Sequence, residues 1–257
     1  MKKKWLLVLM VFLFLQKING QVIHINDLDS VWHFKVSATG SYSDGNLPRS
    51  LLTNKLKLTK VNDLFGLISN FTYQYGTASS KKIIVYNDFR FENTLLLKPK
   101  NFFCPFVRTF SEKNIIRKIK FRHEIALGIL RKIISSKKQG INILVAGVNQ
   151  QTNYNTNSFN IIEYNGSENK NTWKAMAGVS GMNSIVKNKL QAEYRFYWMQ
   201  AFDEPKNYAY FIDVSLEFML NNHFKLQANY VKTFENLEPI GVLPYEIQLT
   251  YGLSVTF

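Results

Sequence analysis

The chain has 257 residues, of which 46% are hydrophobic and 14% aromatic, and its formal net charge is +14. This is enough apolar material for a full core or for the wall of one wide barrel. Cys104 is the only cysteine, which excludes an intramolecular disulfide, and no linker or low-complexity tract divides the sequence. We therefore expect a single domain.

The first twenty residues have the pattern of a secretory signal peptide. Lys2, Lys3 and Lys4 precede an uncharged apolar run at residues 5–15, and a polar stretch follows up to Gly20. The run is shorter than the roughly 20 apolar residues that a spanning helix needs. We expect residues 1–20 to be removed and residues 21–257 to form the mature domain. An uncleaved anchor at the membrane interface is the alternative.

Residues 1–20 carry four lysines and no acidic residue, so the mature chain keeps a charge of +10. Such a basic exported protein suits anionic partners, which include lipid phosphates and small anionic solutes. Export argues against nucleic acid as a partner.

Beyond residue 21, apolar and polar residues alternate with the period of two that is typical of β strands. Turn residues separate the alternating segments. We expect twelve strands, with ten as the alternative, because bacterial barrels of one chain have even strand numbers. The expected strands are residues 31–43, 50–60, 64–76, 82–97, 102–111, 118–129, 140–150, 172–181, 189–198, 208–218, 224–230 and 245–257.

The alternation is clearest in the last segment, which ends on an aromatic residue. Its apolar positions are Tyr245, Ile247, Leu249, Tyr251, Leu253, Val255 and Phe257. In a soluble sandwich these residues would form the core. In a barrel they would face lipid, and the polar or small residues between them would line the lumen. The segment resembles the C-terminal assembly signal of bacterial outer-membrane proteins, which implies recognition by the barrel-assembly machinery.

The connections between the expected strands alternate in length. Short turns are expected at residues 61–63, 98–101, 135–140, 181–184 and 221–222. Longer ones are expected at residues 43–49, 76–82, 150–171 and 235–243. If both termini lie in the periplasm, this puts the long loops outside the cell, as in known outer-membrane barrels.

Residues 34–257 resemble a family of salt-induced outer-membrane proteins, known as domain of unknown function 481. The resemblance rests on Gly45-Asn46 after the first strand, on the strand spacing through Tyr73 and Phe91, and on the segment from Phe121 to Gly128. It departs from the family at Gly128, where more glycines are expected. The resemblance implies an outer-membrane β-barrel, and it brings no catalytic residues.

Charged residues recur on the face of the strands that is expected to line the lumen. Two interpretations are open: the charges pair across the lumen and fill it, or a basic excess near residues 117–122 lines a conduit for anions. The expected lumen-lining charges are Arg90, Glu92, Lys118, Lys120, Arg122, Glu124, Glu193, Arg195, Asp213 and Glu217.

The sequence contains no pattern that predicts catalysis, a cofactor or a metal site. The four histidines, His24, His33, His123 and His223, lack metal-ligand spacing, and no phosphate-binding loop or nucleophile elbow occurs. We expect an all-β, integral outer-membrane protein of a bacterium that is not an enzyme and has a structural or minor pore role. The alternatives are a soluble, lipocalin-like periplasmic binding protein and, with less support, an outer-membrane lipid or peptide hydrolase.

Overall fold

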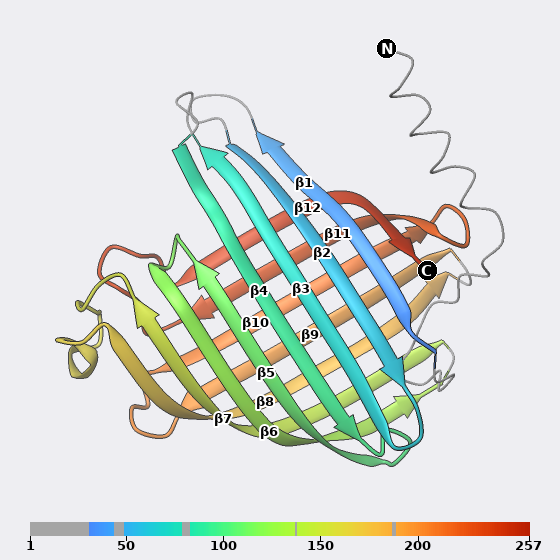
Figure 1. The fold of residues 1–257 in the computed structure, drawn as a ribbon, viewed down its shortest axis with the longest axis horizontal. Coiled ribbons are helices and arrows are strands. Elements are labelled where there is room, and N and C mark those ends of the chain that lie inside the picture. The colour runs from blue at the N-terminus through green and yellow to red at the C-terminus, as the bar shows by residue number, and fades with distance from the viewer. Residues whose placement is uncertain (1–30, 44–48, 79–82, 137, 187–188) are drawn as a thin grey trace.

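The computed structural model describes residues 31–43, 49–78, 83–136, 138–186 and 189–257. In this part of the chain, twelve antiparallel strands close into one barrel, which confirms the expected fold class and the larger strand number (Figure 1). The expected signal peptide lies outside the described residues. The strands are β1 (His33–Ser43), β2 (Arg49–Val61), β3 (Phe65–Ala78), β4 (Ile83–Leu97), β5 (Phe103–Asn114), β6 (Ile119–Ser135), β7 (Gln139–Tyr154), β8 (Asn169–Val186), β9 (Leu190–Ala201), β10 (Tyr208–Met219), β11 (Phe224–Glu235) and β12 (Tyr245–Thr256).

Each strand pairs with its neighbours in sequence, and the first strand closes the barrel against the last. In that seam Lys35 lies opposite Thr256, and Gly40 lies opposite Tyr251. The backbone of Phe257 continues the ladder through hydrogen bonds of 3.1 and 2.9 Å with Phe34. Closure leaves no free sheet edge, which is a requirement for a sheet in lipid.

The two ends of the barrel differ in their connections. We call the end that carries the start of β1, the C-terminus and the turns after β2, β4, β6, β8 and β10 the turn end. The opposite end, with residues 115–118, 155–168, 202–207 and 236–244, is the loop end. The expected turn at residues 181–184 is wrong: these residues lie inside β8, which continues to Val186. The only helix in the described residues is the 3-10 turn η1 (Ile162–Tyr164).

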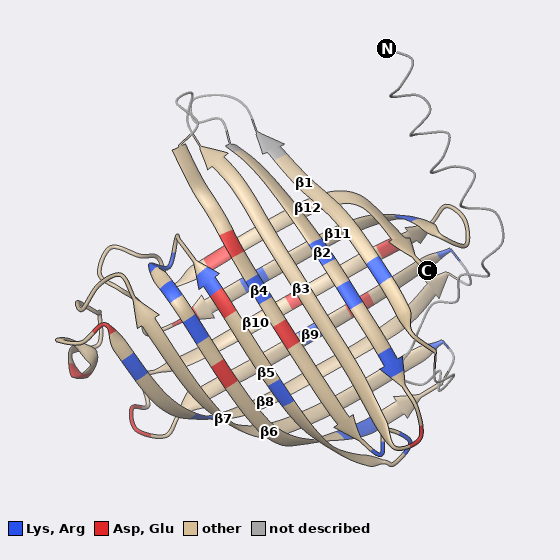
Figure 2. Cartoon of the chain, in the orientation of Figure 1, with Lys and Arg blue, Asp and Glu red and all other residues tan. Residues whose placement is uncertain are grey.

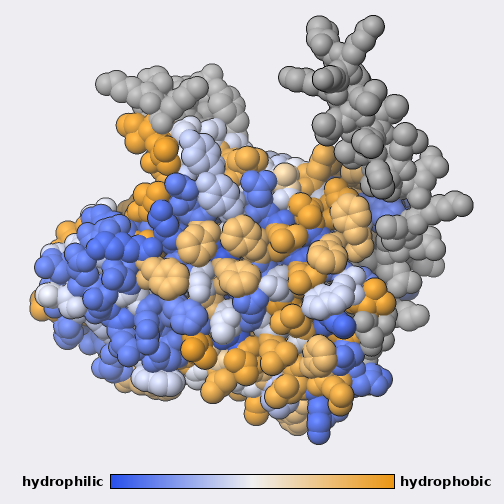
Figure 3. Space-filling view, in the orientation of Figure 1, coloured by the Kyte–Doolittle hydropathy of each residue, from blue (hydrophilic) through white to orange (hydrophobic). Residues whose placement is uncertain are grey.

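The outer wall of the barrel is apolar. In β12, Tyr245, Ile247, Leu249, Tyr251 and Leu253 are 48–58% exposed, whereas the even-numbered Gln248, Thr250, Ser254 and Thr256 are at most 8% exposed. The strand therefore turns its apolar side outward, as expected for a barrel in lipid. In Figure 3 hydrophilic residues gather at the loop end on the left, and apolar residues extend along the strands. No helix in the described residues is long and apolar enough to cross a membrane.

The inner wall is packed closely over part of its area. Gly128 and Gly178 leave room for aromatic rings: a Cβ at Gly128 would lie 2.8 Å from the ring of Phe106, and one at Gly178 would lie 2.5 Å from that of Tyr197. These rings belong to an apolar cluster on β4–β9. The barrel interior is thus partly a packed core, which distinguishes it from a wide aqueous channel.

Candidate functional site

The lumen contains a cavity of about 330 Å³. Side chains from all twelve strands line it, and those with charge come from both sides of the barrel. Figure 2 shows positive and negative residues distributed along the strands and not only in the connections. These charges form three groups of ion pairs, which follow each other from the loop end to the turn end.

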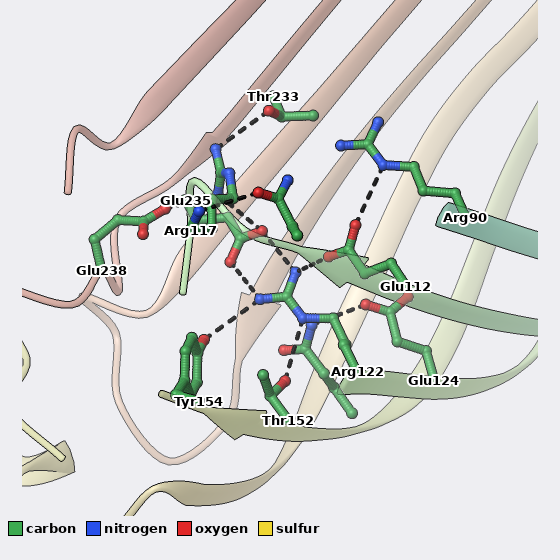
Figure 4. Close-up of polar contacts among 12 residues, drawn as sticks. Arg90, Glu112, Arg117, Arg122, Glu124, Thr152, Tyr154, Thr233, Glu235 and Glu238 are labelled. Carbon is green, nitrogen blue, oxygen red and sulfur yellow. Dashed lines mark hydrogen bonds and ion pairs between the residues drawn. The ribbon is translucent and has the colours of Figure 1, made fainter. Parts of the chain in front are cut away.

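The first group, which we call the loop-end cluster, consists of Glu112, Arg117, Arg122, Glu235 and Glu238 (Figure 4). Arg122 of β6 reaches across the lumen and donates to both carboxylate oxygens of Glu235 on β11, at 2.6 and 2.7 Å. It also donates to Glu112 of β5 at 2.9 Å. Its side chain is only 4% exposed. The planar guanidinium suits this site because its several N–H donors can satisfy several buried acceptors at once.

Arg117 joins this cluster from the connection between β5 and β6. Its Nη1 lies 2.7 Å from Glu238 and 3.0 Å from Glu235, so two carboxylates share one guanidinium nitrogen. Glu238 lies outside the strands, in the connection between β11 and β12. Burial and the neighbouring charge of Glu235 raise the pKa of Glu238 to about 8 from its ordinary value of 4.5.

Two loops pack together next to the cluster. Phe159, in the connection between β7 and β8, forms a β-bridge with Pro239. The Asn160 N–H donates to the carbonyl of Glu238, and Asn160 Oδ1 accepts from the Glu238 N–H, both at 3.0 Å. The apolar side chains that they bury are Ile119, Tyr154, Phe159, Ile161, Tyr164 and Leu237. Because Tyr154 also contacts Arg122 at 3.4 Å, the loop contacts and the cluster form one continuous structure.

The second group crosses the middle of the lumen. Arg195 of β9 lies 3.2 Å from Glu92 of β4 and 2.7 Å from Asp213 of β10. Glu92 also accepts from Arg108 at 3.0 Å, and Arg108 continues to Glu124 at 3.3 Å. Strands β4 and β9 are not neighbours in the sheet, so the Arg195–Glu92 pair bridges the lumen.

The third group, the turn-end cluster, depends on lysines. It consists of Lys35, Lys57, Glu193, Glu217 and Lys225. Glu217 forms ion pairs with Lys35 and, at 3.1 Å, with Lys225. Lys57 of β2 lies 2.8 Å from Glu193 of β9, and their side chains are 30% and 35% exposed.

The structure places eight of the ten predicted charges inside the barrel. Seven belong to these groups, and Arg90 contacts the loop-end cluster through Glu112 at 3.2 Å. Lys118 and Lys120 are the exceptions, and their expected lumen position is wrong. Lys118 has a φ of +57° in the β5–β6 turn and contacts the carbonyl of Ile240. Lys120 is exposed and pairs with Glu168 at 2.7 Å. A bulge between Ile119 and Phe121 shifts the register and reverses the alternation, so that Ile119 points inward and Lys120 outward.

Sequence reasoning missed several partners in the network. Glu235 and Glu238 lie in an expected loop. Arg108 lies in an expected strand with weak alternation, and Glu112 lies one residue beyond the end expected for that strand, which in the structure continues to Asn114. The even positions of Arg108 and Glu112 in β5 were the signal that could have placed both residues in the lumen, because Cys104 and Phe106 lie on the same inner face.

His123 and His223 lie away from the lumen network, and His24 lies outside the described residues. His223 lies in a connection at the turn end. His123 lies on β6 with its Nδ1 2.9 Å from the hydroxyl of Ser111, on the outer side of the strand pair. No group of three or more metal-ligand residues occurs in the described part of the chain.

A closed antiparallel barrel with an apolar exterior and a charged interior defines the class of this protein: it is a β-barrel of the outer-membrane type. Residues 36–257 match the family model described as "Protein of unknown function, DUF481", and the chain belongs to this family. No curated protein matches the chain in sequence.

A solved outer-membrane porin shares the fold. The NanC porin aligns with a TM-score of 0.52 and 10% identity, over 87% of this chain and 98% of the porin. An outer-membrane channel from Pseudomonas putida F1 aligns with a TM-score of 0.48 and 12% identity, over 94% of this chain and 98% of the channel. The translocator domain of the autotransporter NalP from Neisseria meningitidis aligns with a TM-score of 0.46 and 7% identity, over 91% of this chain and 90% of the domain. At these identities the likeness to the porin concerns the fold alone.

Proposed function

We propose that the protein is an integral protein of the bacterial outer membrane and acts there as a narrow pore for small solutes. The observation that carries this proposal is the cavity of about 330 Å³ inside a lumen that ion pairs cross at three levels. The fold shared with the NanC porin is compatible with it. The cross-lumen pairs constrict the passage, so we expect a small conductance.

The apolar outer wall supports insertion in lipid and argues against a soluble binding protein. Leu127, Ile129, Val145 and Leu249, from three strands, are each 48% exposed or more. In water such a continuous apolar surface would promote aggregation. The proposed partners are therefore outer-membrane lipids, the barrel-assembly machinery during insertion, and small anionic solutes in the lumen.

The location is tested by the gel mobility of boiled and unboiled protein from membrane fractions. A folded barrel is expected to migrate differently before and after boiling. Recovery in the soluble periplasmic fraction with identical mobility would contradict insertion in the outer membrane.

The pore is tested by conductance in a planar bilayer. The triple variant Glu92→Gln, Arg195→Gln and Asp213→Asn removes the cross-lumen pair together with the second partner of Arg195. Arg108 keeps Glu124 as its partner, so conductance should rise without a newly unpaired charge. The control, Lys120→Gln, changes an ion pair outside the lumen and should conduct as the parent protein does. If all three proteins are silent in the bilayer, the barrel is a filled, structural one.

A hydrolase is a second candidate because of the Ser111–His123 contact of 2.9 Å on the outer wall. A serine next to a histidine can act as a nucleophile if the histidine accepts its proton. No carboxylate in the described residues is hydrogen-bonded to this histidine, which makes the pore the stronger candidate. Hydrolysis of a fluorogenic short-chain ester, lost in both Ser111→Ala and His123→Ala, would favour the hydrolase.

A further inference from the structure

The cavity in the lumen has two unlike walls. Apolar side chains from β4 to β9 form one patch of the lining, with Phe106, Leu144, Met176 and Tyr197 as its main members, although the same strands also carry charged residues of the ion-pair groups. The part on β2 and β3 is mostly polar and carries Lys55 and Lys57, together with Asn70 and Thr72. The apolar patch packs as part of the barrel core, and where it lines the cavity it also offers an apolar surface to a bound solute.

Charges on the cavity surface are not balanced. Eight cationic and six anionic side chains of the described residues line it. Each of the six carboxylates already has a cation within 3.3 Å. Lys55 is different, because no carboxylate of the described residues lies within ion-pair distance of it. Asp213 interacts with Lys55 at longer range, but its direct partner is Arg195 at 2.7 Å, so Lys55 is the lining cation of the described residues without a carboxylate in direct contact.

The size of the cavity limits what can bind. Its volume of about 330 Å³ is near the lower limit for small-molecule sites in proteins, which span about 300 to 1,000 Å³. Such sites combine an apolar lining with a few polar groups that orient the ligand. The described walls match that description, with Lys55 as the orienting charge.

We propose that this cavity binds a small amphipathic anion: an aromatic or short aliphatic carboxylate, with its charge at Lys55 and its apolar body against Phe106, Leu144 and Met176. The inference rests on the proposed pore function and names the class of solute. An anion gains a charge-assisted hydrogen bond from the lysine, and its apolar part leaves water for the apolar wall.

The test is equilibrium dialysis of the full-length protein in an uncharged detergent, with micelles alone as the blank. Three probes separate the contributions: phenylacetate has ring and charge, acetate has the charge alone, and phenylacetamide has the ring without the charge. Phenylacetate should bind at least about tenfold more tightly than either of the others. Equal binding of phenylacetate and acetate, or of phenylacetate and phenylacetamide, would overturn the inference.

Two variants locate the site. Lys55→Gln should weaken the binding of phenylacetate about tenfold. It should leave the binding of the uncharged phenylacetamide unchanged. Leu144→Asn should weaken both aromatic probes. Lys120→Gln, on the outer wall, is the control and should bind as the parent protein does, and a boiled-against-unboiled gel verifies that each variant is folded. If Lys55→Gln binds phenylacetate normally, the proposed site is wrong.

The bilayer experiment is independent of this one. Conductance without selective binding of phenylacetate would contradict the solute class and leave the pore proposal intact. Selective binding by a protein that is silent in the bilayer would contradict the pore and leave a closed binding site.

Discussion

The loop-end and turn-end clusters both join opposite walls of the lumen, but they do so with different chemistry. Arginines hold the loop-end cluster: the side chains of Arg117 and Arg122 are 3% and 4% exposed, and each contacts two carboxylates. Lysines hold the turn-end cluster: its Lys225–Glu217 pair is also buried, but its Lys57–Glu193 pair is about one-third exposed. A lysine is a point charge on a flexible stem, whereas a guanidinium fixes the geometry of its acceptors.

This difference indicates which end of the lumen is held by the more stable ion pairs. A buried charge that loses its partner costs several kcal/mol, whereas an exposed ion pair contributes little. The loop-end cluster also connects β5, β6 and β11 with the loop that contains Glu238, so its loss affects several elements. We therefore expect the loop end to be the rigid end of the lumen and the turn end to be the adaptable one.

The largest effect is expected for Arg122→Ala. It leaves Glu235 and Glu112 buried without their central partner, so the free energy of unfolding should fall by about 3–5 kcal/mol. Urea unfolding in detergent, followed by tryptophan fluorescence, measures this. Lys120→Ala on the same strand is the control and should change stability by less than about 0.5 kcal/mol. Similar effects of the two substitutions would remove the distinction between buried and exposed pairs.

The pH dependence of stability isolates Glu238. Because its folded pKa is raised to about 8 from 4.5, the folded state binds this proton more tightly than the unfolded state does. The contribution of this proton to the free energy of unfolding is fully present below pH 4.5 and is lost as pH rises through about 8. The free energy of unfolding should therefore fall by roughly 2–4 kcal/mol. Unfolding in urea between pH 5 and 9 tests this.

Glu238→Gln keeps the side-chain size and removes the titrating proton. Its stability should fall less between pH 5 and 9 than that of the parent protein. A loss of stability between pH 5 and 9 that persists unchanged in this variant would assign the pH dependence to another group.

How far the sequence predicts this molecule depends on the range of the interaction. The strands follow from a local pattern, because alternation along β12 is enough to decide which side faces lipid. The bulge at Ile119–Phe121 is also local but has no residue signature, so Lys118 and Lys120 were placed on the wrong side. The pairing of Arg122 with Glu235 spans 113 residues, and only the closed barrel brings the two together.

For the same reason, the sequence leaves two interpretations of the lumen open. The inward position of Arg90 or Glu92 can be read from alternation, but whether their charges are neutralised depends on partners from other strands. The excess at Lys55 becomes visible only after each carboxylate of the cavity has been assigned a cation.

At the turn end, Glu217→Ala should have an intermediate effect. It leaves Lys35 and Lys225 without their shared carboxylate. Lys225 is only 5% exposed, but Lys35 is 19% exposed and can reach water, and either lysine, unlike an arginine, can lose its proton. We expect a loss of about 1–3 kcal/mol, less than for Arg122→Ala. The isosteric Glu217→Gln keeps an acceptor and should lose less in the same urea titration. A larger loss than that of Arg122→Ala would make the turn end the rigid one.

The smallest effect is expected for Lys57→Ala, and it tests the adaptable character of the turn end most directly. The Lys57–Glu193 pair crosses the lumen from β2 to β9, so contact geometry alone would give it the same importance as Arg122–Glu235. Its 30% and 35% exposure means that water already solvates both charges, and its loss should cost at most about 1 kcal/mol. Because the side chain no longer crosses the lumen, conductance in a planar bilayer should nevertheless increase. Stability that hardly changes together with a higher conductance would show that this pair narrows the passage without holding the barrel closed. A loss of several kcal/mol would mean that the turn end is as firmly closed as the loop end.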